Sequence, residues 1–394
     1  MLRVMAAGVR MRAEPSTSGE LVLALPAGAS VLRTQADAVE ADDLTWYEVR
    51  SGTLTGWVAS GPEGDWLAKV SNGRIGFACT DCGADGSRAA VTVEPDGSGL
   101  VVLLPESGSP TWSPDGTQVV IEHEAPDSFD RILTLMAADG SDATPLGSGS
   151  GAAWSPDGEW LAFSDYLARR LVVIDPDGRR FDLTVTDHGA PGALAWSPDS
   201  SRLAFVAIDC EECPTDEPIM GDPPTGIFMF TPPMGAVERV VERGYYGPLT
   251  WGVDGRSLTY LSTDLSFGAN EIRRVDLSTG AVITLLNDSW LLNGWELSPD
   301  ATRLVTATEE GIVVSDADGR NPHLVVTRTA DMNPTPAAPR WSPDGQWILY
   351  DMVWVTGDAI ETWIARADGS GEPRPVSDDA AEAAWQPVLS PLTD

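Results

Sequence analysis

A five-residue motif recurs along this chain and constrains its fold more than any other feature. The motif is Trp-Ser-Pro-Asp-Gly or a close variant of it, and in one copy the Trp stands two residues earlier, which keeps it on the same face of a strand. The Asp residues of consecutive copies lie 42 to 55 residues apart, a period typical of arrays built from one supersecondary unit. The Trp residues of the copies are Trp112, Trp154, Trp196, Trp251, Trp295 and Trp341.

Each copy is followed by the same order of short apolar segments and turns. After the copy at Trp154, for example, segments 160–164, 171–174 and 182–185 alternate in hydrophobicity and are separated by turn residues. In the motif, Pro fixes φ, Asp accepts hydrogen bonds from the following backbone, and Gly supplies the positive φ of the turn. We therefore interpret the motif as a turn in a four-stranded unit, with its Trp packed between adjacent units, and not as a set of catalytic or metal-binding aspartates.

The two ends of the repeat array complement each other. Residues 74–104 contain the later strands of a unit but no Trp strand, whereas Ala383-Ala-Trp385 is a Trp strand with nothing after it. A sheet closed on itself has no open edges, so the economical arrangement pairs these ends. The sequence thus predicts a seven-bladed β-propeller that is closed by the C-terminal strand.

Residues 1–70 lack the repeat. Short strand patterns around Val9, Leu21, Trp46 and Trp57 predict a small barrel, and residues 70–73 are expected to form a short linker. The predicted fold is therefore all-β, with a small domain over residues 1–70 and a propeller over residues 71–394.

Two resemblances follow from these residues. The Trp-Ser-Pro-Asp-Gly turn, the Leu-Ala-Phe strands at 161–163 and 203–205, and the Asp-Gly hairpins resemble the WD40-like (PD40) repeats of TolB-type propellers over residues 72–388. That family typically has six blades, so seven would be a departure. Residues 2–70 resemble bacterial SH3-type (SH3b) domains, and the resemblance implies a module that anchors a protein to the cell wall or to a partner.

Charge narrows the choice of partners. The chain carries a formal net charge of −34, which repels phosphate backbones, so nucleic acid is not expected as a partner. The sequence contains no run of about 20 apolar residues, so no segment is expected to span a membrane. The first residues are too short for a signal peptide, so we expect either a cytosolic protein or one whose export signal is missing from this sequence.

The four cysteines form two Cys-x-x-Cys pairs, Cys79/Cys82 and Cys210/Cys213. Two local disulfides are the favoured interpretation and would imply an oxidising compartment, either outside the cell or in the cell envelope. A four-thiolate zinc site and free thiols are the alternatives, although the pairs belong to units far apart in a seven-membered ring.

Enzyme signatures are weak. The three histidines, His123, His188 and His323, come from different units and do not obviously cluster, so no metal or other cofactor is expected. The segment Gly147-Ser-Gly-Ser-Gly151 matches the Gly-x-Ser-x-Gly pattern of a hydrolase elbow. No helix follows it, so it is interpreted as a flexible loop.

Loop aromatics beside acidic residues are the better candidates for function, because such groups are typical recognition material. In the propeller the candidate ligand-binding residues are Tyr166, His188, Tyr245, Tyr246, Trp290 and Trp354. In the N-terminal part they are Trp46, Tyr47 and Trp57, of which at least two are expected to serve the core.

Together these features predict a non-enzymatic binding protein that is secreted or attached to the cell envelope. Its propeller would hold a protein or peptide, and its N-terminal part would bind peptidoglycan or a partner. A propeller-type polysaccharide lyase or hydrolase, and a structural subunit of a surface assembly, are the alternatives.

Overall fold

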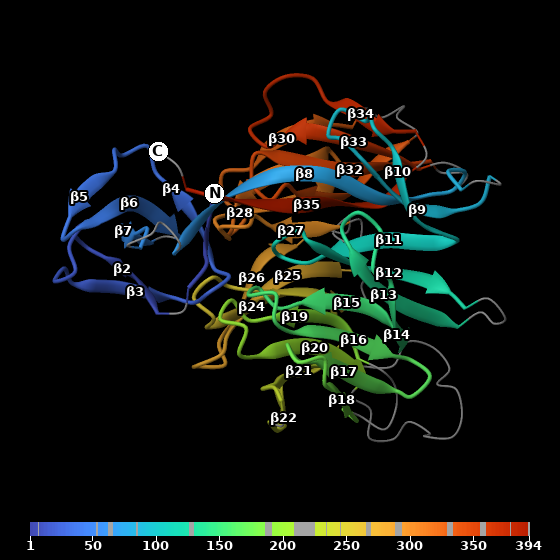
Figure 1. The fold of residues 1–394 in the computed structure, drawn as a ribbon, viewed down its shortest axis with the longest axis horizontal. Helices are drawn as coiled ribbons and strands as arrows, with labels where there is room; N and C mark the ends of the chain where they lie inside the picture. The colour runs from blue at the N-terminus through green and yellow to red at the C-terminus, as the bar shows by residue number, and fades with distance from the viewer. Residues whose placement is uncertain are drawn as a thin grey trace.

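The computed structural model describes most of the chain and consists of strands and their connections (Figure 1). The described residues are 1–392 apart from positions 7, 53, 62–65, 84–85, 126–129, 186–190, 209–224, 234, 245, 265–268, 288–293, 329–333, 355–359 and 379.

Six four-stranded antiparallel sheets form the six blades of a β-propeller. The first strands of neighbouring blades contact one another, so they lie nearest the axis of the ring. In chain order the blades are β11–β14 (Ser107–Trp112, Gln118–Glu124, Arg131–Ala137, Thr144–Ser148), β15–β18 (Ser150–Trp154, Leu161–Asp165, Arg170–Ile174, Arg180–Leu183), β19–β22 (Gly192–Trp196, Leu203–Ile208, Thr225–Phe230, Val237–Gly244), β23–β26 (Tyr246–Trp251, Ser257–Asp264, Ala269–Asp276, Val282–Asn287), β27–β30 (Trp295–Leu297, Arg303–Thr308, Gly311–Asp316, His323–Thr327) and β31–β34 (Thr335–Trp341, Trp347–Val353, Ile360–Arg366, Arg374–Ser377).

The remaining strands form one eleven-stranded sheet, in which β35 pairs with β8 and β5 pairs with β6 beside the path β10-β9-β8-β1-β4-β6-β7-β2-β3. Its strands are β1 (Leu2–Val4), β2 (Val9–Arg12), β3 (Leu21–Leu25), β4 (Ser30–Arg33), β5 (Val39–Ala41), β6 (Leu44–Ser51), β7 (Leu54–Ala59), β8 (Leu67–Cys79), β9 (Ala89–Val93), β10 (Val101–Pro105) and β35 (Ala381–Pro391).

The predicted seven blades and separate SH3-like barrel are wrong. Strand β8 runs from Leu67 to Cys79 without a break, through the expected linker at residues 70–73. Its first half pairs with β1 and its second half with β9, so the N-terminal strands and the strands expected to form a seventh blade share one sheet. The propeller thus has six separate blades, and the shared sheet lies between the last blade and the first, where β35 contacts β32 and β11.

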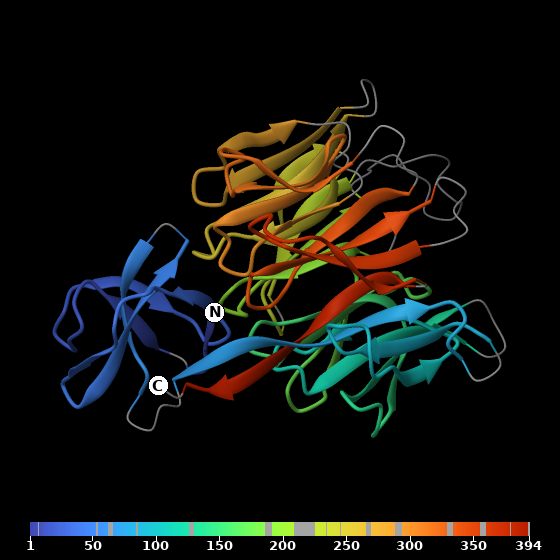
Figure 2. The same cartoon turned by 90° about the horizontal axis from the view of Figure 1, so that it is seen from above.

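The predicted pairing of the chain ends is present. Strand β35 pairs antiparallel with β8 from Ala381 opposite Ala78 to Pro391 opposite Ala68. Figures 1 and 2 show the two strands side by side, leaving the propeller toward the N-terminal strands. Trp385 is buried in a cluster with Ile75 and Phe77 of β8, and this cluster continues into the last blade.

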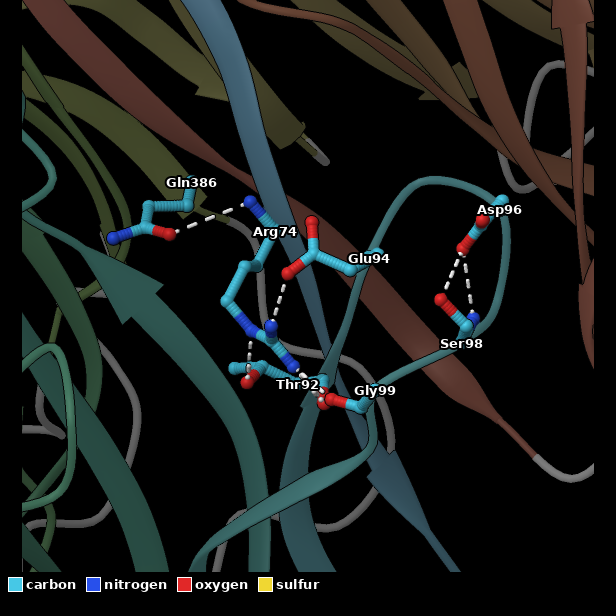
Figure 3. A network of polar contacts seen from close by, with 7 residues as sticks. All are labelled: Arg74, Thr92, Glu94, Asp96, Ser98, Gly99 and Gln386. Carbon is cyan, nitrogen blue, oxygen red and sulfur yellow. Dashed lines mark hydrogen bonds and ion pairs between the residues drawn. The ribbon is translucent and has the colours of Figure 1, made fainter.

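Polar contacts add to this seam (Figure 3). The side-chain oxygen of Gln386 accepts from the Arg74 amide at 3.3 Å, and its amide nitrogen donates to the Gly116 carbonyl at 2.8 Å. The Arg74 guanidinium donates to the Thr92 hydroxyl at 2.8 Å, to Glu94 and to the Gly99 carbonyl. One side chain of β35 therefore connects β8 to the turn of the first blade, while Arg74 holds the hairpin after β9.

The repeated turns have the predicted chemistry. In the first blade, Ser113 donates to the Asp115 carboxylate at 2.6 Å, and the same carboxylate accepts from the Thr117 amide at 3.1 Å. The following Gly116 has a φ of 70°. The indole of the motif Trp also reaches the preceding blade, since Trp196 donates to the Ala153 carbonyl at 3.0 Å. The motif thus shapes the turn and ties adjacent blades together.

The Gly147–Gly151 segment is not a flexible loop. It spans the end of β14 and the start of β15, with Gly149 between the two strands. A Cβ atom on Gly149 would lie 2.6 Å from the Phe163 ring, so glycine is required by the packing there.

Candidate functional site

One end of the ring is covered by the N-terminal strands. These strands lie beside the propeller at the end that carries the repeated turns (Figures 1 and 2). Gly28 approaches the Pro156 backbone of the second blade, and Gly52 approaches Val253 of the fourth. Arg50 forms an ion pair with Asp300 of the fifth blade at 3.7 Å. The N-terminal strands therefore contact turns of the second, fourth and fifth blades at this end of the ring.

A half-buried arginine, Arg3, anchors this contact. Arg3 donates through Nη1 to the Pro156 carbonyl at 3.0 Å. Burial lowers the pKa of the Arg3 guanidinium, and Asp115 of the first blade opposes that shift. Each repeated turn carries an aspartate, so this end of the ring is acidic. A cationic side chain is therefore favourable there.

The opposite end of the channel holds a cavity of about 1140 Å³. It is bounded by the start of β11, the end of β12, the first residue of β13 and parts of β15, β31 and β35. Its charged lining residues are Arg88, Glu106, Glu122, His123, Glu124, Arg131, Arg340 and Glu382. We call this cavity and its charged residues the open mouth.

Some of these charges are paired within the protein. Arg131 forms an ion pair with Glu122, and this hydrogen bond raises the pKa of the guanidinium. His123 lies 2.9 Å from the Thr134 hydroxyl through Nε2. The pair and the histidine therefore hold β12 and β13 together at the rim.

Three carboxylates at the open mouth are not paired with another described side chain. Glu106, Glu124 and Glu382 are exposed, and no described residue makes a hydrogen bond or ion pair with their side-chain oxygens. The charges of Glu124 and Glu382 contribute to the raised pKa of Arg131. After internal pairing, the open mouth presents more negative than positive charge.

Two acids with raised pKa values, Asp351 and Glu296, lie near Arg340. Asp351 is 7% exposed and accepts from the Thr362 hydroxyl at 2.9 Å. Burial raises the pKa of Asp351 to about 6, although the Thr362 hydrogen bond and the charge of Arg340 oppose the shift. Burial also raises the pKa of Glu296, whose carboxylate accepts from the Trp341 amide at 2.5 Å. The charge of Arg340 thus acts on these two acids, while its side chain also lines the cavity.

The raised pKa of Asp351 predicts a pH effect on stability. The folded protein keeps this proton up to about pH 6, whereas the unfolded chain releases it near pH 4. The free energy of unfolding contributed by this group is therefore fully present below pH 4 and falls as pH rises to 6, by about 3 kcal/mol. Asp351→Asn should remove this step from the difference between wild-type and variant urea-unfolding curves measured across that range. The exposed control Asp142→Asn should follow the wild type, and a step that persists in D351N would assign it to another group.

The structure disperses the aromatic residues predicted to bind a ligand. Tyr166 is 57% exposed beside the open mouth, Trp46 and Tyr47 are buried in the core of the N-terminal strands, and Trp57 is half-buried. Tyr246 packs edge-on against Tyr260, and Trp354 is half-buried with its indole nitrogen inside the protein. Three more of the predicted residues lie outside the described part of the chain: His188, Tyr245 and Trp290.

Sequence reasoning missed the charged residues on the first strands, such as Arg340 and Glu382. A signal was present, because Arg340 directly precedes the Trp of its repeat, where a wholly buried strand would carry an apolar residue. An axial channel is where such a charge can be accommodated.

Cys79 and Cys82 are joined by a disulfide, with Cα atoms 5.6 Å apart. Cys210 and Cys213 lie outside the described residues. His323 contacts the Ala367 carbonyl through Nε2 at 3.1 Å, far along the chain from His123 at the rim. Within the described ranges, no three His, Cys, Asp or Glu side chains come together in a way that could hold a metal ion.

Comparisons with known proteins support the fold. No protein-family model and no curated protein matches this sequence. Among solved structures, the chain resembles the tricorn protease (TM-score 0.54, 12% identity, 90% of this chain and 40% of that one) and the β-propeller domain of the Trilobed protease from Pyrococcus furiosus (0.51, 10%, 89% and 96%). It also resembles TolB from Acinetobacter baumannii (0.47, 16%, 80% and 66%).

The chain therefore spans less than two thirds of the TolB chain and less than half of tricorn. At these identities the likeness establishes the β-propeller fold alone, and the predicted propeller is confirmed at that level. No helix among the described residues is long and apolar enough to cross a membrane.

Proposed function

We propose that this protein is a non-enzymatic binding protein that holds a peptide segment of a protein partner at the open mouth. One observation carries the proposal: the end of the ring opposite the N-terminal strands holds a cavity of about 1140 Å³ lined by charged side chains. A polar cavity held by packed strands suits the binding of a ligand.

The internal pairs favour binding over catalysis. Glu122 and Arg131 neutralise each other, and the charge of Arg340 stabilises the ionised forms of Asp351 and Glu296, so these charges are balanced within the protein. A lyase or hydrolase that uses a metal held by histidine and acidic side chains gains no support from the described residues, where no such group assembles.

In this function residues 71–394 form the open mouth, and residues 1–70, which lie against the other end of the ring, would hold the protein to the cell wall or to a partner. Peptidoglycan binding is tested by sedimenting the full chain with insoluble peptidoglycan. Retention of the protein in the supernatant would remove peptidoglycan as a partner.

The Cys79–Cys82 disulfide supports a location outside the cell or in the cell envelope, because such bonds persist in oxidising compartments. Alkylation of protein taken directly from its native source should leave both thiols unmodified until a reductant is added. Immediate alkylation of Cys79 and Cys82 would contradict this location.

A random displayed-peptide library tests the binding function. Panning on the wild-type chain should enrich sequences that bind measurably when synthesised with a fluorescent label. Reversal of two exposed charges at the open mouth, Glu124→Lys with Glu382→Lys, should weaken that binding at least tenfold, because a favourable contact becomes repulsive.

The matched control reverses two exposed acids away from the open mouth, Glu238→Lys on β22 and Glu372→Lys before β34, and so changes net charge equally. We expect the control to bind as the wild type does. Failure to enrich any peptide, or equal loss in both double variants, would refute binding at the open mouth.

A further inference from the structure

A second cavity, of about 490 Å³, adjoins the open mouth. Arg131 lines both cavities, so the two are neighbours that lie on either side of this side chain. The second cavity lies between the first and second blades, and we call it the side groove. Its lining residues are Asp130, Arg131, Ser148, Gly149, Ser150, Tyr166 and Leu167.

One wall of the side groove is an exposed apolar hairpin tip. Tyr166 and Leu167 follow β16 and are 57% and 64% exposed. Large apolar side chains left this open, beside a polar cavity, mark sites of contact with another molecule. The pair is positioned to cover an apolar side chain lying in the side groove.

The tip is held in place from below. The buried Asp165 carboxylate accepts from the Ala168 amide at 3.0 Å and from the Ser148 hydroxyl at 3.2 Å. It also forms an ion pair with Arg180 at 3.4 Å. These contacts order the hairpin before a ligand arrives, so binding there costs little conformational entropy.

Glycine keeps the floor of the side groove close to the second blade. A Cβ atom on Gly149 would lie 2.6 Å from the Phe163 ring and 3.1 Å from the Ser164 carbonyl. Both neighbours belong to β16, the strand that leads into the apolar tip. The floor and the tip are thus parts of one packed unit.

The neighbouring open mouth sets the charge of the ligand. Its exposed carboxylates Glu106, Glu124 and Glu382 outnumber Arg88 and Arg340, the cationic lining residues that form no ion pair with a described carboxylate. The net charge of −34 attracts cations over a longer range. A ligand that reaches from the side groove into the open mouth is therefore expected to be basic where it meets these acids.

We propose that the side groove and the open mouth together bind an extended basic peptide. One apolar side chain would lie against Tyr166 and Leu167, and a neighbouring lysine or arginine would meet the carboxylates of the open mouth. This inference rests on the proposed binding function and specifies the chemistry of its ligand.

The composition of the peptides enriched by panning tests the inference. Peptides selected on the wild type should contain an apolar residue close to lysine or arginine. A second panning uses the double variant Tyr166→Ser with Leu167→Ser, and its peptides should keep the basic residues but lose the preference for the apolar one. A labelled wild-type peptide should bind this variant about tenfold more weakly, as expected for one lost apolar contact.

A control separates the hairpin tip from exposed apolar surface in general. Val282 and Ile283 on the outer strand β26 are 48% and 56% exposed, and their double change to Ser should leave both the selected sequences and the affinity unchanged. Salt should weaken binding, because ionic contacts are screened.

Each adverse result has its own meaning. Acidic peptides, or an apolar preference that survives the loss of Tyr166 and Leu167, would overturn the inference while leaving the proposed binding function in place. Absence of any selected peptide would overturn both.

Discussion

Deletion of residues 380–394 should destabilise the entire propeller and not merely fray one end. Strand β35 pairs with β8 along nearly its whole length, and Trp385 is 7% exposed in the cluster that joins β8 to the last blade. Removing a buried Trp alone costs about 3–5 kcal/mol, and the deletion also exposes a strand edge. Because the total stability of a domain is about 5–15 kcal/mol, we expect the deletion variant to lose cooperative unfolding or to melt far below the wild type.

A graded series makes this result interpretable even if the deletion variant fails to fold. Gln386→Ala removes only the side chain that bridges the Arg74 amide and the Gly116 carbonyl, at a cost of about 1–2 kcal/mol. Trp385→Ala should be intermediate, and removal of residues 393–394 alone should have little effect. Thermal unfolding followed by near-ultraviolet circular dichroism measures the series. A deletion that melts with the wild type would show that β35 does not hold the ring closed.

The repeat could be read from sequence because its information is local. A turn of Ser, Pro, Asp and Gly needs only its own backbone to be satisfied, and the contacts of Ser113 and Asp115 lie within five residues. The orphan strands at the two ends also predicted the pairing of β35 with β8, because an unpaired edge is unfavourable wherever it lies.

The prediction of seven blades was wrong because the partners of a strand decide where the strand ends. Ser71, Asn72 and Gly73 have the composition of a linker, yet Ser71 pairs with Val388 and Asn72 with Pro387. Those partners lie more than 300 residues away, beyond the reach of any local pattern. Because β8 continues through these residues, the N-terminal strands join the sheet that was expected to be a seventh blade.

The candidate site was predicted less well than the fold, for a related reason. Exposed Tyr166 could be found, since an aromatic residue in a turn is conspicuous. The open mouth is instead made of charged residues that each come from a different strand, such as Glu106, Arg131, Arg340 and Glu382, and only ring closure brings them together. Likewise Trp46 and Tyr47 cannot be told from binding aromatics until their burial is known.

Gly28→Ala should separate the N-terminal strands from the turns that they cover. Gly28 has a φ of 84°, and a Cβ atom there would lie 2.4 Å from the Pro156 carbonyl carbon and 2.7 Å from the Asp157 amide nitrogen. These are backbone atoms and cannot rotate away. Gly28 cannot easily withdraw either, since its amide donates to the Val4 carbonyl at 2.7 Å.

Gly8→Ala provides the matched control. Gly8 has a φ of 80°, but no atom lies within 4 Å of its added Cβ, so this variant carries the cost of the positive φ alone, about 1 kcal/mol. Gly28→Ala should cost about 3 kcal/mol more, because the clash must be relieved by moving one surface off the other. Hydrogen exchange should then accelerate at the turn amides of Ser155, Asp157 and Gly158 in G28A and not in G8A. Equal stability and equal exchange in the two variants would mean that the N-terminal strands do not pack tightly on the ring.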